Sequence, residues 1–188
     1  MELKYLRVNE KQLTEKLLIS SKQVLLLKEL LKDLIQKEVL VINTHFGLEV
    51  YYESSDDYTN IIKNILTLVM SEKRDVNVCF DVLSLQNEKE IQCIIDMSIV
   101  HVVEESIFLK YLKSMLNQVN LQQKSNRKII KKLSQIWNET TRNLQRNDVN
   151  LKEIQALHAD FQQVYINNIK DKVLKELITD AVYTKFVN

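Results

Sequence analysis

The chain has 188 residues, of which 45% are hydrophobic, and a formal net charge of +1, so it is long enough to bury a core and is not disordered in composition. It holds one glycine, Gly47, and no proline, which excludes phosphate-binding loops of the Walker or dinucleotide type because these need several glycines. Residues 1–120 carry 14 Lys and Arg against 18 Asp and Glu, and residues 121–188 carry 12 against 7. The scarcity of turn-forming residues predicts a helix-rich chain with a basic C-terminal part.

The first predicted element is a long helix over residues 9–37. Apolar residues recur in two rows with a spacing of seven: Leu6, Leu13, Leu27, Leu34 and Val41, and Leu17, Val24 and Leu31. Ser20 interrupts the stripe, and further leucines widen it beyond the seam of a two-stranded coil. This pattern predicts a helix that packs on more than one side.

Residues 39–53 lose the helical period. A short β-branched run at 39–42 precedes Gly47, after which Leu48, Val50 and Tyr52 alternate with more polar residues. The pattern indicates a small hairpin that turns near Gly47. The alternative is that the first helix continues to His45 and is capped by Gly47.

A second predicted strand and two helices complete the middle of the chain. Residues 54–57 combine serines and aspartates that favour a helix start, and this helix runs to about residue 72. Residues 75–85 alternate as a strand does, and if they pair with residues 48–52, the middle of the chain is a small β element with a helix crossing over it. Asn87 and Glu90 then start a helix toward residue 120; in the alternative, residues 98–103 form another strand and residues 39–120 a small α/β domain.

Residues 121–146 form the most amphipathic predicted helix. One face gathers Ile129, Ile130, Leu133, Ile136, Trp137, Thr140 and Leu144. The opposite face gathers Lys124, Arg127, Lys128, Lys131, Lys132, Arg142 and Arg146. No acidic residue occurs between Lys124 and Lys132, so this face presents a field of one sign that suits an acidic neighbour.

A last helix follows from residue 151 to residue 181, about 50 Å long at 1.5 Å per residue, and is expected to fold back on residues 121–146. We therefore predict a mainly α fold: an elongated, antiparallel, coiled-coil-like helical bundle in one domain, 1–188. It comprises a long N-terminal helix (1–38), a central region (39–120) with a small β element around 39–53 and 75–85, and a C-terminal helical hairpin (121–188). The alternative is a small α/β core with long flanking helices.

No catalytic, cofactor-binding or metal-binding residues are predicted. The three histidines, His45, His101 and His158, have no partner at metal-ligand spacing, and Cys79 and Cys93 are expected to be buried, reduced thiols. The N-terminus lacks the apolar core of a signal peptide and no apolar run is long enough to span a bilayer. These features predict an intracellular protein, cytoplasmic or nuclear, that is not an enzyme and needs no cofactor.

Two functions remain in view. The first is a non-enzymatic scaffold or adaptor subunit that contacts other helical subunits, as a hetero- or homo-oligomer, and presents the basic face of residues 124–146 to an acidic protein surface. The second is a nucleic-acid-associated protein whose basic face follows a phosphate backbone. The absence of a ribonucleoprotein motif and the nearly neutral net charge favour the adaptor.

Overall fold

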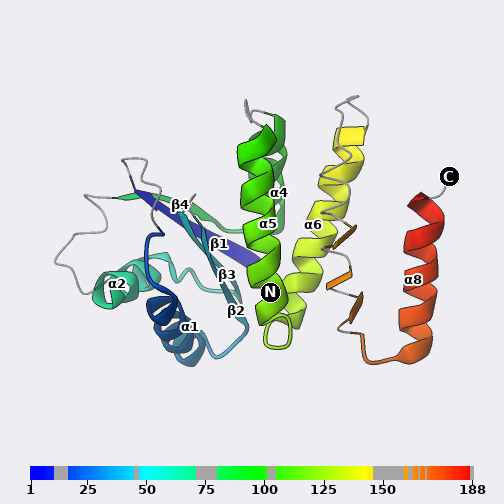
Figure 1. Cartoon of the computed structure of the whole chain (residues 1–188). Helices are drawn as coiled ribbons and strands as arrows, with labels where there is room; N and C mark the ends of the chain where they lie inside the picture. Colours follow the sequence, from blue (N-terminus) through cyan, green and yellow to red (C-terminus); the bar gives the residue numbers. More distant parts are fainter. Residues whose placement is uncertain are drawn as a thin grey trace.

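The computed structural model describes residues 1–10, 17–44, 47–70, 80–100, 105–145, 159–160, 163–164, 166–167 and 169–186. Within these ranges the chain forms four strands and, around them, the helices labelled in Figure 1. The strands are β1 (Glu2–Glu10), β2 (Val39–Thr44), β3 (Gly47–Ser54) and β4 (Phe80–Leu85). The helices are α1 (Ser21–Ile35), α2 (Thr59–Val69), α4 (Glu88–Val100), α5 (Glu105–Gln122), α6 (Arg127–Gln145) and α8 (Lys172–Phe186).

The four strands form one antiparallel sheet in the order β2-β3-β1-β4. In the centre of the sheet, β1 pairs with β3 so that Tyr5 lies opposite Tyr51 and Arg7 opposite Glu49. Helix α1 connects β1 to β2, and α2 connects β3 to β4. This is the β-α-β-β-α-β connectivity of the split β-α-β, or ferredoxin-like, motif.

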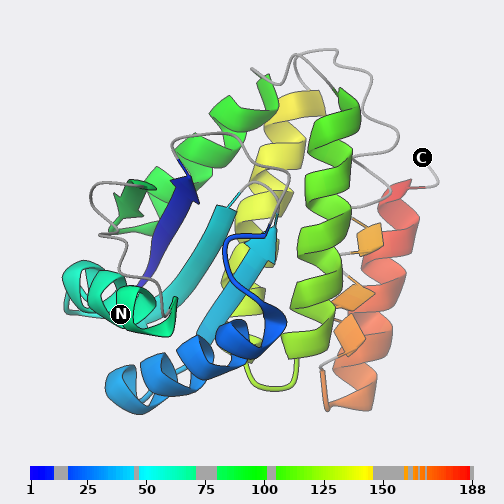
Figure 2. The ribbon, with the colours of Figure 1, turned by 60° about the vertical axis from the view of Figure 1, so that its left-hand side comes forward.

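Helices cover both faces of the sheet (Figures 1 and 2). On one face, α1 and α2 pack on alternate strand residues such as Leu6, Val41 and Val50. On the other, α4, α5 and α6 pack on the intervening residues, among them Tyr5 and Ile42. Every residue of β2 and β3 is buried, because both of their faces are covered.

The prediction of an elongated, coiled-coil-like helical bundle is therefore wrong. The molecule is an α/β structure with a sheet at its centre, and the alternative of a small α/β core with flanking helices describes it. The error has a physical reason: β1, the central strand that pairs with both β3 and β4, has buried apolar residues on both of its faces, so it lacks the alternation by which a half-buried strand is recognised.

The predicted long N-terminal helix shows this error most clearly. Leu6 lies in β1, where it is buried, and the helix begins only at Ser21. Ser20 is the N-cap of α1, since its side chain accepts a hydrogen bond from the amide of Gln23 while the Gln23 side chain accepts one from the amide of Ser20 (2.8 Å). The apparent seven-residue repeat thus joined residues of three separate elements, β1, α1 and β2.

The hairpin near Gly47 is confirmed, and the alternative of a capped helix is wrong. Strand β3 starts at Gly47, whose φ of 125° favours glycine, and an added Cβ would lie 2.6 Å from the carbonyl oxygen of Val8 and closer still to the Asn9 side chain. A strand over residues 80–85 is also confirmed, while residues 75–79 lie outside the described residues. The pairing considered for this strand, with residues 48–52, does not occur, because β4 pairs with β1.

Side chains of α5 seal the outer edge of the sheet along β2. The Gln118 side chain accepts from the amide of Asn43 and donates to its carbonyl oxygen, both at 2.8 Å, as a neighbouring strand would. One turn later, Gln122 donates to the carbonyl oxygen of Val41 at 2.6 Å. These contacts satisfy backbone groups that an edge strand otherwise leaves open to pairing with another chain.

The predicted 50 Å C-terminal helix is interrupted. Residues 169–171 are not helical, and α8 begins after them, with the Asp171 side chain accepting from the amide of Leu174 at 3.1 Å. Residues 151–158 of that prediction lie outside the described residues. The predicted helix over 87–120 is likewise two helices, α4 and α5, and no strand occupies residues 98–100.

Candidate binding surface

Helix α6 presents the amphipathic pattern expected from its sequence. Its apolar side is buried against the sheet and α4, with Trp137 5% exposed and Ile129 and Ile130 fully buried. Thr140 shares this side, and the burial of Leu144 lies outside what the structure describes. The helix starts at Arg127 and not at Leu121, because Leu121 and Gln122 end α5 and a turn separates the two helices.

The start of α6 is fixed by a carboxylate from another part of the chain. One oxygen of Glu38, between α1 and β2, accepts hydrogen bonds from the amides of Lys128 (2.7 Å) and Ile129 (3.1 Å). These amides belong to the first turn, where a helix leaves its N–H groups free and carries partial positive charge. Glu38 therefore serves as a distant N-cap and ties the end of α1 to α6.

Lys132, one of the predicted basic-face residues, is engaged within the fold. Its ammonium group lies 2.9 Å from a carboxylate oxygen of Glu53 and 2.7 Å from one of Glu88, and it donates to the carbonyl oxygen of Met1 at 3.1 Å. Burial lowers the pKa of Lys132, but the hydrogen bonds and charges of Glu88 and Glu53 outweigh burial and raise the pKa overall. This cation joins α6 to the sheet and to α4.

The remaining predicted cations divide into two groups. Lys124, Arg127, Lys128 and Lys131 are exposed at the α5–α6 turn and on the first turns of α6. Among the described residues, no carboxylate forms an ion pair with any of these four side chains. Arg142 belongs to α6 but its side chain is outside the described part, and Arg146 lies outside the described residues.

Helix α1 adds cations that sequence reasoning missed. The Lys28 ammonium donates to the Ser125 hydroxyl at 3.2 Å, and Lys32, Lys37 and Ser125 line a pocket of about 580 Å³ between α1 and the α5–α6 turn. Burial, and then the neighbouring charge of Lys32, lowers the pKa of Lys28. The spacing of Lys28 and Lys32 puts them on one side of α1, but only the fold brings that side to α6.

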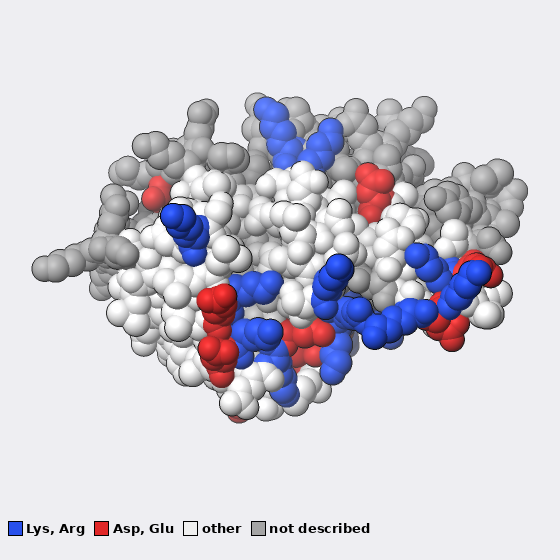
Figure 3. Space-filling model, turned by 60° about the horizontal axis from the view of Figure 1, so that its bottom comes forward, with Lys and Arg blue, Asp and Glu red and all other residues white. Residues whose placement is uncertain are grey.

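We call the combined set the basic surface: Lys28, Lys32, Lys37, Lys124, Arg127, Lys128 and Lys131. Figure 3 views the underside of the molecule, where Lys and Arg side chains gather with a smaller number of acidic ones between them. Asp33 and Glu38 line the same pocket as Lys32 and Lys37. The basic surface is therefore positive overall but is not a uniform field.

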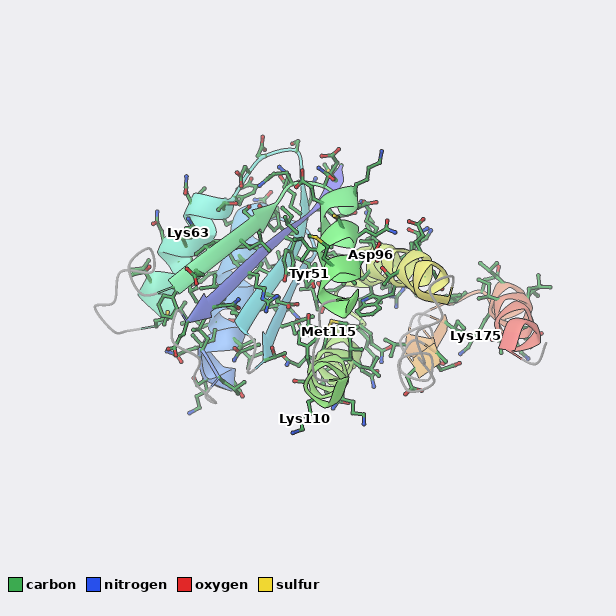
Figure 4. All side chains as sticks on the ribbon, turned by 90° about the horizontal axis from the view of Figure 1, so that it is seen from above. Tyr51, Lys63, Asp96, Lys110, Met115 and Lys175 are labelled. Atoms are coloured by element: carbon green, nitrogen blue, oxygen red, sulfur yellow. The ribbon has the colours of Figure 1, made fainter. Side chains whose placement is uncertain are left out.

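A second polar cluster lies inside the molecule, between β1, β3 and α5. Glu49, 1% exposed, accepts from the hydroxyl of Tyr51 at 2.9 Å and from that of Tyr111 at 2.6 Å. The rings of Tyr5 and Tyr51 contact each other in a tilted arrangement, with centroids 4.8 Å apart. Burial, and then the charge of Glu49, raises the pKa of all three tyrosines well above the ordinary value. Figure 4 places Tyr51 between the sheet and the helices that cover it.

Because this cluster is buried, this face of the sheet is not accessible to nucleic acid. Exposed aromatic residues on neighbouring central strands are the platform on which some four-stranded sheets stack RNA bases. Here Tyr5 and Tyr51 occupy such positions, but both are at most 5% exposed beneath the helical layer. Their hydroxyl groups serve the internal network, so base stacking on this face is excluded.

The residues considered for metal or redox chemistry form no site in the described part of the chain. No three His, Cys, Asp or Glu side chains gather there as metal ligands would. Cys93 is exposed, so the prediction of a buried thiol is wrong for this residue, whereas Cys79, His45, His101 and His158 lie outside the described residues. None of the described helices is both long and apolar enough to cross a bilayer.

Comparison with known proteins places no constraint on the function. No protein-family model, no curated protein and no solved structure matches this chain.

Proposed function

We propose that this protein is a non-enzymatic adaptor subunit that binds an acidic segment of a partner protein through the basic surface. The observation that carries the proposal is the contact of α1 with the α5–α6 turn: Lys28 bonds Ser125, and Lys32 and Lys37 line a pocket with Ser125, the residue that follows Lys124 in the sequence. Structural cations are usually met by carboxylates, as Lys132 is by Glu53 and Glu88. The exposed cations around Ser125 have no such ion pair within the described part of the chain.

The basic surface is held in place before any partner arrives. Glu38 fixes the end of α1 to the first turn of α6, and the Lys28 bond to Ser125 joins α1 to the turn. A partner therefore meets cations whose backbones are already ordered, which reduces the entropy lost on binding. Attraction between exposed charges is screened beyond about 8 Å at physiological salt, so the binding should weaken steeply as salt is added.

Contacts with other helical subunits form the second part of the proposal. Val173, Leu174 and Leu177 of α8 are 66%, 48% and 62% exposed. Large aliphatic side chains of this exposure, gathered on one side of a helix, suit a helix from another protein. An adaptor with one charged and one apolar contact surface follows.

A nucleic-acid partner is the second candidate. In its favour, Lys32 and Lys37 border a pocket with Ser125 of the α5–α6 turn, and lysine and arginine side chains bind phosphate. Against it, Asp33 and Glu38 lie inside the same surface and would repel a phosphate backbone. We therefore rank an acidic protein segment first, because its spaced carboxylates can avoid these two positions.

Fluorescence anisotropy with two probes tests the proposal: a labelled glutamate-rich peptide and a labelled DNA duplex, each titrated with the full chain. The variant Lys128→Glu/Lys131→Glu should bind the acidic peptide about tenfold or more weakly, since it reverses two exposed charges. The matched control is Lys110→Glu/Lys113→Glu, which makes the same charge change on exposed residues of α5 (Figure 4). Lys113 is about 18 Å along the helix from Ser125 at 1.5 Å per residue.

Each outcome has a definite meaning. Peptide binding that is lost in the α6 variant and kept in the control supports the adaptor. Tighter binding to the duplex than to the peptide, with the same dependence on Lys128 and Lys131, would favour the nucleic-acid alternative. Equal loss in both variants would show that net charge alone governs binding and would overturn the assignment to this surface.

A further inference from the structure

The outer side of α1 and α2 carries a large exposed apolar surface. Its members are more than a third exposed, between 40% for Ile61 and 77% for Leu68. We call this set the leucine surface: Leu26, Leu30 and Leu34 of α1, with Ile61 and Leu68 of α2. Single exposed leucines are ordinary on a soluble protein, but five aliphatic residues from two neighbouring helices mark a contact site.

The spacing of these residues shows that they form one surface. Leu26, Leu30 and Leu34 follow at intervals of four and lie on one side of α1. That side faces α2, because Gln23, on the same side of the helix, donates to the carbonyl oxygen of Val69 at 2.8 Å. The core of this layer uses other residues, such as Leu27, Leu31 and Leu66, which are fully buried. The exposed leucines are therefore additional to what the fold requires.

The charges along α1 indicate which partner fits the leucine surface. Lys22 stands on the exposed side near the start of the helix, and Glu29 and Asp33 stand on the same side toward its end. Two copies of α1 packed antiparallel would bring each Lys22 beside the acidic residues of the other copy. A parallel arrangement would place like charges together, which costs energy. The helix is thus complementary to itself in one orientation.

We infer that a second copy of this chain covers the leucine surface, with the two α1 helices packed antiparallel about a twofold axis. Such a contact is isologous, since the same residues of both copies meet, and it closes at two subunits. It buries the exposed leucines at its centre and leaves the opposite-charge pairs at its rim, as stable interfaces do. Lys28 and Lys32 lie on the other side of α1, toward Ser125, so the dimer leaves the basic surface of each copy open.

Sedimentation equilibrium of the full chain over a range of concentrations tests this inference. The chain of 22.2 kDa should show a reversible association to twice that mass. Leu26→Glu/Leu30→Glu should raise the dissociation constant about tenfold or more, because it buries four carboxylates in the dimer. Leu121→Glu is the matched control, since Leu121 is 86% exposed at the end of α5, away from this surface. Circular dichroism of each variant checks that the fold is kept.

A charge exchange distinguishes the antiparallel dimer from other associations. Lys22→Glu alone should weaken the dimer, and Lys22→Glu combined with Glu29→Lys and Asp33→Lys should restore it, since the triple variant reverses both sides of each pair. A wild-type chain that remains a monomer at the highest soluble concentration would overturn the inference. So would a dimer that survives Leu26→Glu/Leu30→Glu, or one that the charge exchange fails to restore.

Discussion

Removal of the Glu38 carboxylate tests how the basic surface is assembled. Glu38 is the one side chain seen to bond the first-turn amides of α6 in the described structure, accepting from Lys128 and Ile129. Glu38→Ala removes both hydrogen bonds and the negative charge at the positive end of the helix. The same change separates the α1–β2 connection from α6, so the stability of the whole C-terminal layer should fall.

The expected loss of stability in Glu38→Ala follows from the two hydrogen bonds that Glu38 accepts. Loss of an N-cap side chain costs about 0.5–2 kcal/mol, and hydrogen bonds to a charged group contribute about 1.5–3 kcal/mol each when they are well shielded. Glu38 is half-buried, so water can reach the freed amides and the cost should lie near 2 kcal/mol. Glu38→Gln keeps an acceptor oxygen but loses the charge, and about half of that loss is expected.

Urea unfolding followed by tryptophan fluorescence is a suitable assay, because Trp137 is the single tryptophan and lies buried on α6 itself. Glu139→Gln provides the control, since it neutralises an exposed carboxylate on α6 itself, eleven residues beyond Lys128. The expected order of stability is wild type and Glu139→Gln, then Glu38→Gln, then Glu38→Ala. Equal stability of Glu38→Ala and Glu139→Gln would refute the capping role, and with it the argument that the cations are held in place in advance.

Three further predictions concern the core and the sheet. Trp137→Ala should cost about 3–5 kcal/mol in urea unfolding because the buried ring leaves a cavity, and a loss below about 1 kcal/mol would place the ring at the surface. Gln118→Ala should lower the free energy of unfolding by about 1–2 kcal/mol and expose the backbone groups at the β2 edge. On mild heating this variant should therefore scatter more light than the control Gln123→Ala, and equal scattering would contradict the role of Gln118 in covering the edge. Tyr5, Tyr51 and Tyr111 have pKa values raised above the ordinary 10.0, so the stability they contribute is complete below pH 10 and is lost as the pH rises through their folded pKa values. Tyrosinate absorbance should therefore appear for these three only as the protein unfolds, and full titration of all tyrosines in the folded state would contradict their burial.

Local patterns in the sequence were sufficient to predict those features that depend on a single helix or turn. The amphipathic α6 and the capping pair of Asn87 and Glu90 could be predicted without knowledge of the fold. The Asn87 side chain accepts from the backbone amide of Glu90 at 3.0 Å and donates to the Glu90 carboxylate at 2.7 Å. The hairpin at Gly47 was readable because glycine at that position has a positive φ. In each case the signal lies within a few neighbouring residues.

Strand β1, which joins β3 to β4 in the sheet, could not be predicted in the same way because it is buried on both faces. Strand β1 carries Leu3, Tyr5, Leu6 and Val8, so apolar residues fall on both sides of the strand and mimic a helical stripe. A sequence signal existed at Ser20 and Gln23, whose spacing is that of a capping box, and it would have started α1 at Ser21.

Three of the seven residues of the basic surface were also beyond sequence reasoning. Lys124, Arg127, Lys128 and Lys131 were identified from the charge pattern of one helix. Lys28, Lys32 and Lys37 join them only because the fold brings α1 and the residues after it to the α5–α6 turn. Lys132 does not belong to the basic surface, because the fold places Glu53 and Glu88 beside its ammonium group and both form ion pairs with it.

The most direct measurement is the affinity of the α1 variant Lys28→Glu/Lys32→Glu for the glutamate-rich peptide, compared with the α6 variant and the wild type. If α1 and α6 form one binding surface, the α1 variant should lose affinity by about the same factor as Lys128→Glu/Lys131→Glu, about tenfold or more, while Lys110→Glu/Lys113→Glu does not. Wild-type affinity in the α1 variant would contradict the account, because the acidic partner would then contact α6 alone.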